Sequence, residues 1–395
     1  MNREALCHAV RQTLVRLPAP YESHYGIVPL PPPEEPIAIG DGRAVMEEAI
    51  AALREVETLA REISDPWIIS RIIARQEALS SSAIEGTNST LDEVLSVEEA
   101  ADDIARNDAR QVRSYALALD RLVPEARAVG HNIFSLDLIR QLHREVMRDN
   151  PDYQDNPGEW RAQVVWIGGR SIEHSTLNPP PPDRVEGCLL HTVDYLRNQG
   201  MQAQTQNLLT RMAVAHAHFE AVHPFRDGNG RVGRLLLPLI MAADGRVPLY
   251  LSPYIEARKD RYYANLKAAQ QQLNWGAAAG FMAEAVVATV QELNATRQAL
   301  RHLRMLWLER RKLRGGSSAL RTLNVLSDYP VLTVNRLASW LDITFPAAAK
   351  AVDTLVSMGV LTERTGHRRN RLFAATEVLS ILNRPFGTEP ALPDR

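Results

Sequence analysis

The segment of sequence that decides the fold reads His223-Pro-Phe-Arg-Asp-Gly-Asn-Gly-Arg-Val-Gly-Arg234. Apolar residues at helical spacing precede it over 208–222, and a strongly apolar run, Leu235 to Met241, follows it. The pattern predicts two helices joined by a glycine-containing loop. Because free backbone N–H groups and the positive end of the helix dipole meet at the start of the second helix, the loop is a predicted anion site.

The glycines and arginines of this segment suit a phosphate ligand. Gly228 and Gly230 allow unusual backbone dihedral angles and a close approach of the backbone to a ligand. Arg231 and Arg234 lie one helical turn apart, so both guanidinium groups can reach one phosphate chain. Two arginines in a glycine loop do nothing for packing, which favours a binding role over a structural one.

Two further side chains add reactive chemistry to anion binding. His223 stands directly before the loop, and an imidazole has an intrinsic pKa suited to general-base catalysis near neutrality. Asp227 offers a hard carboxylate of the kind that Mg²⁺ prefers. A base, a metal-binding carboxylate and a phosphate site within twelve residues indicate phosphoryl or nucleotidyl transfer.

Three other interpretations of the segment fit less well. The run from Gly228 to Gly233 has G-x-G-x-x-G spacing, but a dinucleotide loop requires a preceding strand, and a helical pattern precedes this one. The Asp-Gly-Asn-Gly run is like the start of a calcium loop, but Pro238 occupies the twelfth position, where glutamate is required. His216 and His218 face different ways from His223 on a helix, so they are expected to be ordinary histidines.

The composition is that of an ordinary globular chain, with 45% hydrophobic and 23% charged residues. Its 395 residues allow two or three domains. The formal net charge of -2 excludes a global basic field for nucleic acid. Cys7 and Cys188 are too few for a disulfide framework and indicate a reducing compartment. With no signal pattern and no apolar run of membrane-spanning length, we expect a cytoplasmic protein without membrane contact.

We expect a mostly helical protein in four parts, which are residues 1–105, 106–280, 281–314 and 315–395. In the first part, helices are predicted from about 41 to 63 and from about 67 to 86. Thr90 and Glu93 then have the spacing of a capping box that begins the next helix. The third part, 281–314, is predicted to be one long connecting helix.

Two stretches interrupt the helical pattern. Prolines and glycines exclude a long helix over 150–182, and Ala162-Gln-Val-Val-Trp-Ile167 is predicted, with the residues after it, to form a β-hairpin. In 315–395 a Gly-Gly-Ser-Ser hinge precedes three predicted helices (320–326, 334–341, 345–358) and two short strands (360–364, 371–375). That order predicts a winged helix, whose wing is basic (Arg364, His367, Arg368, Arg369, Arg371).

The segment His223 to Arg234 resembles the signature of the Fic family, H-x-F-x-[DE]-G-N-G-R-x-x-R, at every fixed position. The resemblance extends over most of residues 30–300. It implies the Fic fold, a mostly α-helical core with a β-hairpin called the flap, here followed by the winged helix. It also implies ATP as substrate, Mg²⁺ as cofactor, and transfer of AMP to a protein hydroxyl with release of pyrophosphate.

The resemblance implies a role for each position of the loop. His223 would take the proton from the attacking Tyr, Thr or Ser hydroxyl, and Asp227 would hold Mg²⁺ between the α- and β-phosphates. Backbone N–H groups of Gly228 to Arg231, with the Asn229 side chain, would cradle the phosphates, while Arg231 and Arg234 would neutralise the β- and γ-phosphates. The nucleotide-binding residues of the segment are then Gly228, Asn229, Gly230, Arg231, Val232, Gly233 and Arg234.

Two segments outside the loop resemble further nucleotide-side features. The flap would face ATP through Ile167, Gly168, Gly169 and Arg170, and it would hold the target chain by main-chain pairing. Tyr262, and more weakly Gln270, match positions that contact the adenosine. A half-buried aromatic pair is an equally good interpretation of Tyr262 and its neighbour Tyr263.

A third segment resembles the family's inhibitory pattern, [ST]-x-x-x-E-[GN]. Ser81-Ser-Ala-Ile-Glu-Gly86 fits this pattern and makes Glu85 the inhibitory residue. Because the segment precedes the core, the chain resembles the class with an N-terminal inhibitory helix. Taken alone, the same residues would indicate a plain helix C-terminus capped by Gly86.

Other activities stay open at the same site, namely transfer of a different nucleotide or phosphate-containing group, or removal of AMP. A hypothesis of another class is a DNA-binding regulator that uses the Fic-like core as a sensor, although winged helices also serve as protein-interaction modules. The expected partners are a target protein at the flap, the protein itself through self-modification, DNA or a protein at the winged helix, and a second copy in a homodimer.

Overall fold

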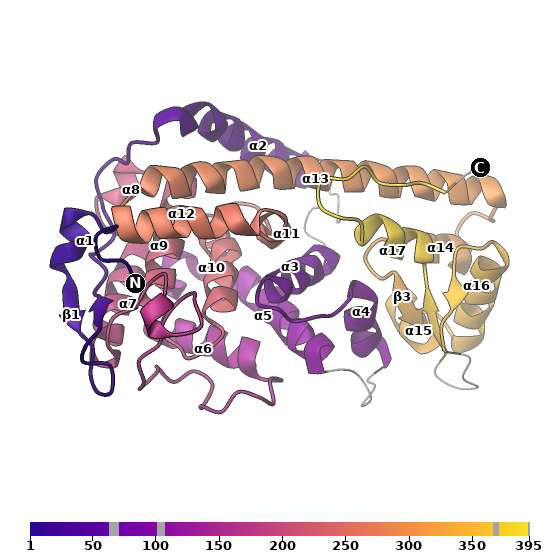
Figure 1. The fold of residues 1–395 in the computed structure, drawn as a ribbon. Helices are drawn as coiled ribbons and strands as arrows, with labels where there is room; N and C mark the ends of the chain where they lie inside the picture. The colour runs from indigo at the N-terminus through magenta and orange to yellow at the C-terminus, as the bar shows by residue number, and fades with distance from the viewer. Residues whose placement is uncertain (63–70, 101–106, 366–370, 394–395) are drawn as a thin grey trace.

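The computed structural model describes residues 1–62, 71–100, 107–365 and 371–393. Most of them are helical, as the sequence predicts, and small antiparallel sheets lie towards the two ends of the molecule (Figure 1). The long helix α13 (Trp275–Arg310) runs from the helical core to the C-terminal part. Over the described ranges, no helix is both long enough and apolar enough to cross a membrane.

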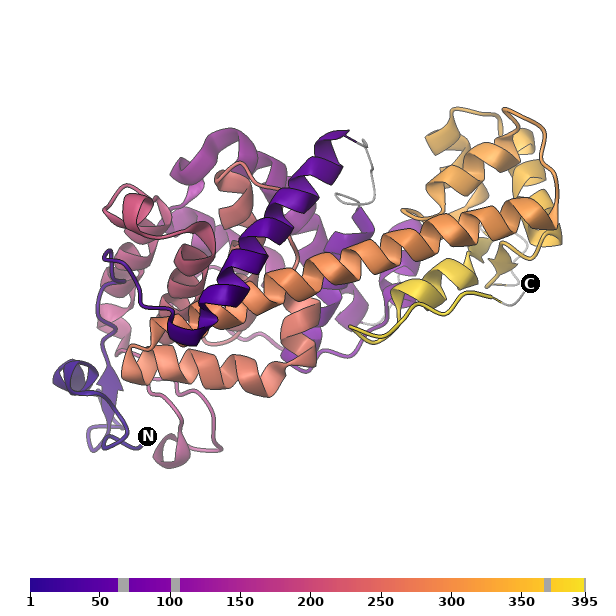
Figure 2. The same cartoon turned by 90° about the horizontal axis from the view of Figure 1, so that it is seen from above.

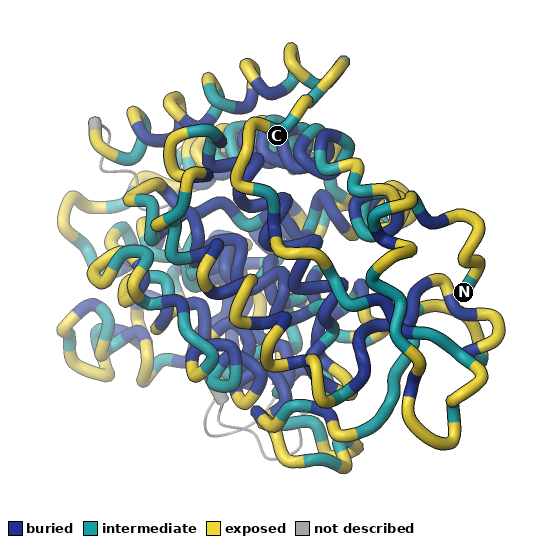
Figure 3. The backbone as a smooth tube through the Cα atoms, turned by 90° about the vertical axis from the view of Figure 1, so that its left-hand side faces the viewer, coloured by how far each residue is buried: buried dark blue, intermediate teal, exposed yellow. Residues whose placement is uncertain are grey.

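The centre of the core is the pair of helices that flank the predicted anion site. Helices α9 (Leu208–Val222) and α10 (Asn229–Ala243) are buried along almost their whole length, which Figure 3 shows as a dark interior. Each fully buried leucine of α10 contributes about 1.5–3 kcal/mol to stability. This burial fixes the position and direction of the loop between the two helices.

The other helices of the core surround this pair. Helix α13 packs on α9 and on α2, and seen from above (Figure 2) α2 lies across α13. The surrounding helices are α2 (Arg43–Glu62), α3 (Arg71–Ile84), α4 (Leu91–Ala100), α5 (Asn107–Val129), α6 (Leu136–Met147), α7 (Val185–Leu196), α8 (Gln202–Thr205), α11 (Ser252–Ala257) and α12 (Lys259–Gln272). The N-terminal segment adds α1 (His8–Gln12) and the paired strands β1 (Leu14–Arg16) and β2 (Tyr25–Ile27).

The predicted elements of the N-terminal region agree with the structure in kind. The capping box is formed, since the backbone N–H of Thr90 donates to Glu93 Oε2 at 3.0 Å and that of Glu93 donates to Thr90 Oγ1 at 3.2 Å. Helix α4 begins at the next residue, Leu91. The start predicted for the second helix, at about 67, lies outside the described residues.

The flap is shorter than the sequence predicts. One antiparallel bridge joins Ile167 to Leu177, and the five residues before it, 162–166, form no ladder. The second arm instead pairs with the N-terminal sheet, because Ile27 N donates to Asn178 O at 2.9 Å. The turn needs glycine, since Gly168 has φ +69° and a Cβ at Gly169 would lie 2.3 Å from His174 O.

The long helix begins earlier than predicted and ends at Arg310, short of 314. Asn274 explains its start, because its side chain caps the helix by accepting a hydrogen bond from Ala277 N at 3.2 Å. The segment after it has the predicted helices and strands plus two elements that were missed, β3 and α17. Its elements are α14 (Ser318–Val325), β3 (Val331–Thr333), α15 (Val334–Leu341), α16 (Phe345–Ser357), β4 (Thr362–Glu363), β5 (Leu372–Ala374) and α17 (Thr376–Leu382), with sheet order β3-β5-β4.

The C-terminal part is packed directly on α3 and α4. Ile72 and Ile73 of α3 belong to the same hydrophobic cluster as Leu332 and Phe373 of the C-terminal sheet. Polar contacts cross the same boundary, including Arg364 to Asp92 at 2.6 Å, Arg336 to Glu99 at 3.2 Å, and Gln76 Nε2 to Leu382 O at 2.8 Å. Helix α3 therefore touches the C-terminal part near one end and the catalytic core along the rest.

Candidate functional site

His223 ends α9 in a left-handed backbone conformation, with φ 49° and ψ 62°. Such a conformation is uncommon for a residue other than glycine and turns the chain sharply out of the helix. The buried Arg161 holds this turn, since its Nε donates to His223 O at 2.8 Å and its Nη2 donates to Pro180 O at 2.6 Å. Arg161 was missed in the sequence. Its signal was a lone arginine within the apolar part of a loop.

The electrostatic surroundings keep the His223 imidazole neutral. Burial lowers its pKa from the ordinary 6.5 to about 4, and the charge of Arg161 acts in the same direction. The opposing influences of Glu85 and Asp227 are smaller. At neutral pH the ring can therefore accept a proton, which is the state that a general base requires.

The Asn229 side chain holds the loop together from inside. Its Oδ1 accepts from Phe225 N and its Nδ2 donates to Phe225 O, both at 2.9 Å. The residue is 1% exposed, so its amide is fully used within the protein. The prediction that this side chain cradles phosphates is therefore wrong, because the amide makes the loop instead of contacting the ligand.

His143 supports the same loop and was also missed in the sequence. Its ring stacks on Phe225 with centroids 3.7 Å apart. Its Nδ1 accepts from Gly158 N at 2.7 Å, which leaves the proton on Nε2, the atom that lies 3.1 Å from Asp227 O. Burial lowers its pKa to about 4, so the neutral tautomer fits this arrangement.

The first turn of α10 has the geometry of an anion site. The first intrahelical hydrogen bond runs from Val232 N to Gly228 O at 3.0 Å, so the N–H groups of residues 229–231 have no acceptor within the helix. Val232 is fully buried with its N–H used, and a Cβ at Gly233 would lie 2.4 Å from Glu220 Oε1. The nucleotide contacts predicted for Val232 and Gly233 are therefore wrong. Both residues pack α10 against its neighbours.

Glu85, at the end of α3, places its carboxylate in this anion site. Its Oε1 lies 2.6 Å from Arg234 Nη2, and a Cβ at Gly230 would be only 2.1 Å from the same oxygen. Arg234 also donates from Nε to Ser81 Oγ at 2.9 Å and from Nη2 to Ser81 O at 2.8 Å. The predicted inhibitory segment and the predicted phosphate ligand are thus in direct contact.

The Glu85–Arg234 pair is charged on both sides. Burial alone would raise the pKa of Glu85, but the charge and hydrogen bond of Arg234 outweigh it, and the net shift is downward. Burial would lower the pKa of Arg234, but Glu85 again outweighs it and the net shift is upward. The carboxylate therefore occupies the anion site as an anion.

The other charged groups of the segment differ in exposure. Arg231 is 4% exposed, and its Nη1 donates to Gln111 Oε1 at 3.3 Å, so its guanidinium points into the helical core. The Asp227 side chain is 56% exposed and lies 3.5 Å from Arg231 Nη2. No group of three or more His, Cys, Asp or Glu side chains suited to a metal occurs among the described residues. Asp227 fits Mg²⁺ as a single protein ligand, because Mg²⁺ commonly takes its other ligands from substrate phosphates and water.

The predicted adenosine contacts divide between core and surface. Tyr262 is 3% exposed and its hydroxyl lies 2.7 Å from His216 Nε2, so it is a core residue in this conformation. Tyr263 beside it is 43% exposed, with the two rings 5.2 Å apart. Gln270 Nε2 donates weakly to Ala217 O at 3.4 Å. Of the aromatic pair, Tyr263 is the residue that a ligand can reach.

The flap lies against α12 through Gln271, whose Nε2 donates to Thr176 O at 2.7 Å. Ile167 packs on a small apolar cluster with the N-terminal segment, and Arg170 at the turn is exposed. Taken together, a neutral buried base, an anion site at a helix N-terminus and an exposed carboxylate define a helical protein that binds phosphate groups next to a proton acceptor.

Comparison with known proteins agrees with this class. Residues 133–241 match the model of the Fic/DOC family, and residues 44–121 match that of the Fic/DOC family N-terminal region. The chain belongs to the Fic/DOC family. The first match covers α9, α10 and the loop between them, and the second covers α3 and Glu85.

Relatives with curated names match only part of this chain. Protein adenylyltransferase fic-1 of Caenorhabditis briggsae is 33% identical over 190 residues, which are 47% of this chain and 35% of the relative. Protein adenylyltransferase Fic of Drosophila mojavensis is 26% identical over 227 residues, or 57% and 41%. The match to this chain therefore spans well under half the length of either relative. A crystal structure of a Fic family protein from Desulfovibrio desulfuricans G20 shares the fold, with a TM-score of 0.52 and 23% identity over 86% of this chain and 98% of that one.

The position of His223 predicts an unusual titration. Its imidazole should titrate with a midpoint near pH 4, against an ordinary 6.5. The neutral ring then stabilises the fold above pH 6.5, and that contribution is lost as the pH falls towards 4. Histidine Cε1–Hε1 NMR signals, assigned with a His223→Asn variant, measure the midpoint. A midpoint near 6.5 would contradict the buried, neutral imidazole.

Proposed function

We propose that the protein is a protein adenylyltransferase, which transfers AMP from ATP to a Tyr, Thr or Ser hydroxyl of a target protein. The observation that carries the proposal is the neutral, buried His223 beside the N-terminus of α10. A proton acceptor next to an anion site is what the reaction needs, because the attacking hydroxyl must lose its proton as it meets a phosphate. The names of the relatives support the same activity.

The chain's own residues suffice for the proton and charge movements of this reaction. His223 takes the proton of the attacking hydroxyl, whose oxygen bonds to the α-phosphorus of ATP while the bond to the pyrophosphate oxygen breaks. Backbone N–H groups of residues 229–231 and the Arg234 guanidinium hold the phosphates. Asp227 would hold Mg²⁺, which when bound neutralises charge on the departing pyrophosphate.

The same geometry supports autoinhibition by Glu85. Its carboxylate occupies Arg234 and lies against Gly230, where a phosphate would bind. A bound triphosphate then loses one cationic ligand and meets a negative charge. Repulsion displaces the phosphates, and a misplacement of about 1 Å at the reacting centre can cost about 10²-fold in rate.

Removal of the base tests the activity. His223→Ala should lower AMP transfer by about 10²–10⁴-fold and leave ATP affinity nearly unchanged, because the imidazole acts on the hydroxyl and not on the phosphates. Incubation with labelled ATP and a host lysate, followed by mass analysis of labelled peptides, measures transfer and shows whether AMP or another group was moved. Calorimetry measures ATP binding. Transfer at the wild-type rate by the variant would remove His223 from the mechanism.

Removal of the inhibitory carboxylate tests the regulation. Glu85→Gly should raise transfer, including self-modification, by well over tenfold, since it frees Arg234 without adding a catalytic group. Glu85→Gln is the matched control, because it keeps the side-chain shape while removing the charge, and its rate should lie between the two. Arg234→Ala should lose activity even in the Glu85→Gly background. Equal initial rates for wild type and Glu85→Gly would show that Glu85 merely ends its helix.

A second candidate function is DNA binding through 315–395, whose order of elements supports a winged helix. The surface of α16 gives this function little charge, since the exposed Phe345 and Val356 accompany one cation, Lys350, and one anion, Asp353. Arg364 is paired with Asp92 and Arg371 with Glu363. His367, Arg368 and Arg369 of the predicted wing lie outside the described residues. We therefore favour a protein partner over DNA for this part of the chain.

A salt titration separates the two partners. The full chain should shift a duplex DNA probe weakly or not at all, even at low salt, because few cations are available to release counterions. Gel shifts at several salt concentrations measure this, with an Arg368→Ser/Arg369→Ser variant as the control for the wing. Tight binding whose logarithm falls steeply with the logarithm of salt concentration, and which that variant loses, would establish the DNA-binding function instead.

A further inference from the structure

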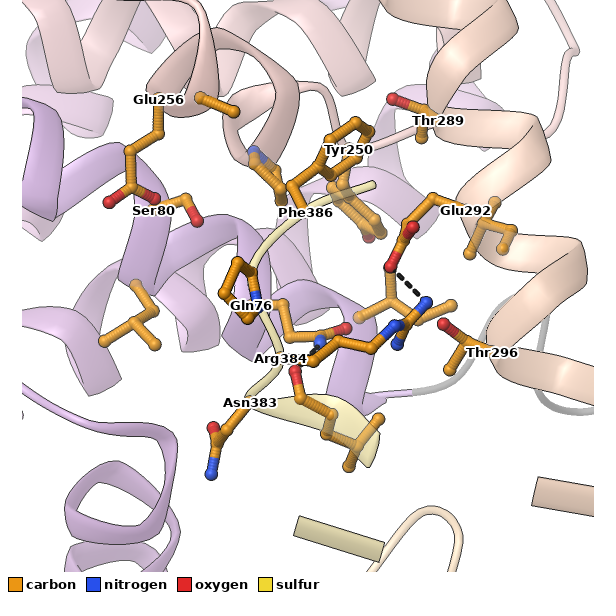
Figure 4. A pocket seen from close by; sticks show the side chains of 17 residues that line it. Gln76, Ser80, Tyr250, Glu256, Thr289, Glu292, Thr296, Asn383, Arg384 and Phe386 are labelled. Carbon is orange, nitrogen blue, oxygen red and sulfur yellow. Dashed lines mark hydrogen bonds and ion pairs between the residues drawn. The ribbon is translucent and has the colours of Figure 1, made fainter. Parts of the chain in front are cut away.

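A cavity of about 450 Å³ lies beside the inhibitory helix, away from the anion site. It is enclosed by α3, α11, α13 and the chain that follows α17 (Figure 4). Its volume is in the range of about 300–1,000 Å³ that is usual for small-molecule sites. Ile73, Gln76 and Ser80 of α3 line it, whereas Ser81 and Glu85 of the same helix contact Arg234.

The walls of the cavity combine apolar surface with an unpartnered polar group. Tyr250 and Phe386 place aromatic rings inside it, and leucines complete the apolar lining. The Thr289 side chain lines the cavity, is 6% exposed as a residue, and its Oγ1 has no hydrogen-bond partner within the described part of the chain. Buried hydroxyls are normally satisfied, so this one is available to a ligand.

The charges of the cavity select the kind of ligand. Its one lining cation, Arg384, is already held by Glu292, by Ile381 O at 2.7 Å and by Thr388 O at 2.8 Å. Glu256 at the other side has no printed partner to neutralise it among the described residues. An anion such as a nucleotide would find no available cation here, whereas a protonated amine would find an unpaired carboxylate.

The cavity is linked mechanically to the active site through α3. Gln76 ties the helix to Leu382 O, and the buried Glu77 ties it to α11 by accepting hydrogen bonds from Ser252 N at 2.8 Å and Ser252 Oγ at 2.6 Å. An occupant would touch α3, α11 and the chain after α17 together. The cavity exists in the conformation in which Glu85 holds Arg234, so a ligand that fits it stabilises that conformation.

We propose that this cavity is a regulatory site for a small organic amine with a flat apolar body, and that its occupation strengthens inhibition by Glu85. The binding part of this inference stands on the cavity alone, whereas the effect on rate rests on the proposed AMP transfer. The ligand would place its amine at Glu256 and its body between Tyr250 and Phe386, with Thr289 as a further hydrogen-bonding group.

Two probes with the same indole body test the site on the full-length protein. Calorimetry and ligand-observed NMR should detect binding of tryptamine, a protonated amine, and none of indole-3-propionate, a carboxylate. Thr289→Val should weaken tryptamine binding about fivefold, as expected for one lost hydrogen bond, and Glu256→Gln should weaken it by a similar factor. Glu309→Gln, which removes an exposed charge from α13 outside the cavity, should leave binding unchanged.

The rate measurement then tests the regulation separately. Saturating tryptamine should lower AMP transfer by wild type and have no effect on Glu85→Gly, because that variant has no inhibitory contact to stabilise. Absence of tryptamine binding, equal binding of both probes, or binding that neither cavity variant weakens would overturn the site. Binding with an equal effect on wild type and Glu85→Gly would overturn the link to Glu85. Binding without transfer by any variant would leave the site in place and reject the proposed function.

Discussion

The arrangement of the site depends on one buried cation, Arg234. A guanidinium that is 1% exposed needs compensating charge and hydrogen bonds, since desolvation of an ion costs several kcal/mol. Glu85 and Ser81 supply these partners from α3. Any ligand that takes Arg234 must therefore replace what α3 provides. For this reason the position of α3, and every contact that fixes it, bears on the active site.

The loop before Arg234 is rigid for a different reason. Its polar groups are satisfied from inside the protein, by the Asn229 amide, by His143 under Asp227 and by Arg161 on the His223 carbonyl. These contacts hold a left-handed residue at the end of α9, and strained backbone of this kind persists only where the surroundings enforce it. The result is a base and an anion site whose relative position changes little when a ligand binds.

Helix α3 connects parts of the molecule that are far apart in sequence. Its first turn packs in a hydrophobic cluster with the C-terminal sheet, its middle lines the cavity beside α13, and its last turn contacts Arg234. A short helix with well-packed sides moves as one body more easily than it bends. A partner or ligand on either neighbour can therefore act on the active site through this helix.

The sequence by itself determined the local features, because they depend on neighbours within a turn or two of the chain. The loop between two apolar helices, the capping box at Thr90 and the glycine turn of the flap are of this kind. Only the tertiary structure decided the contacts made across long separations. Glu85 and Arg234 are 149 residues apart, and Arg161 reaches His223 across 62. The same packing buried Tyr262, left Tyr263 exposed and turned the Asn229 amide inward. No local pattern contains these outcomes, since they follow from which helix faces meet when the core closes.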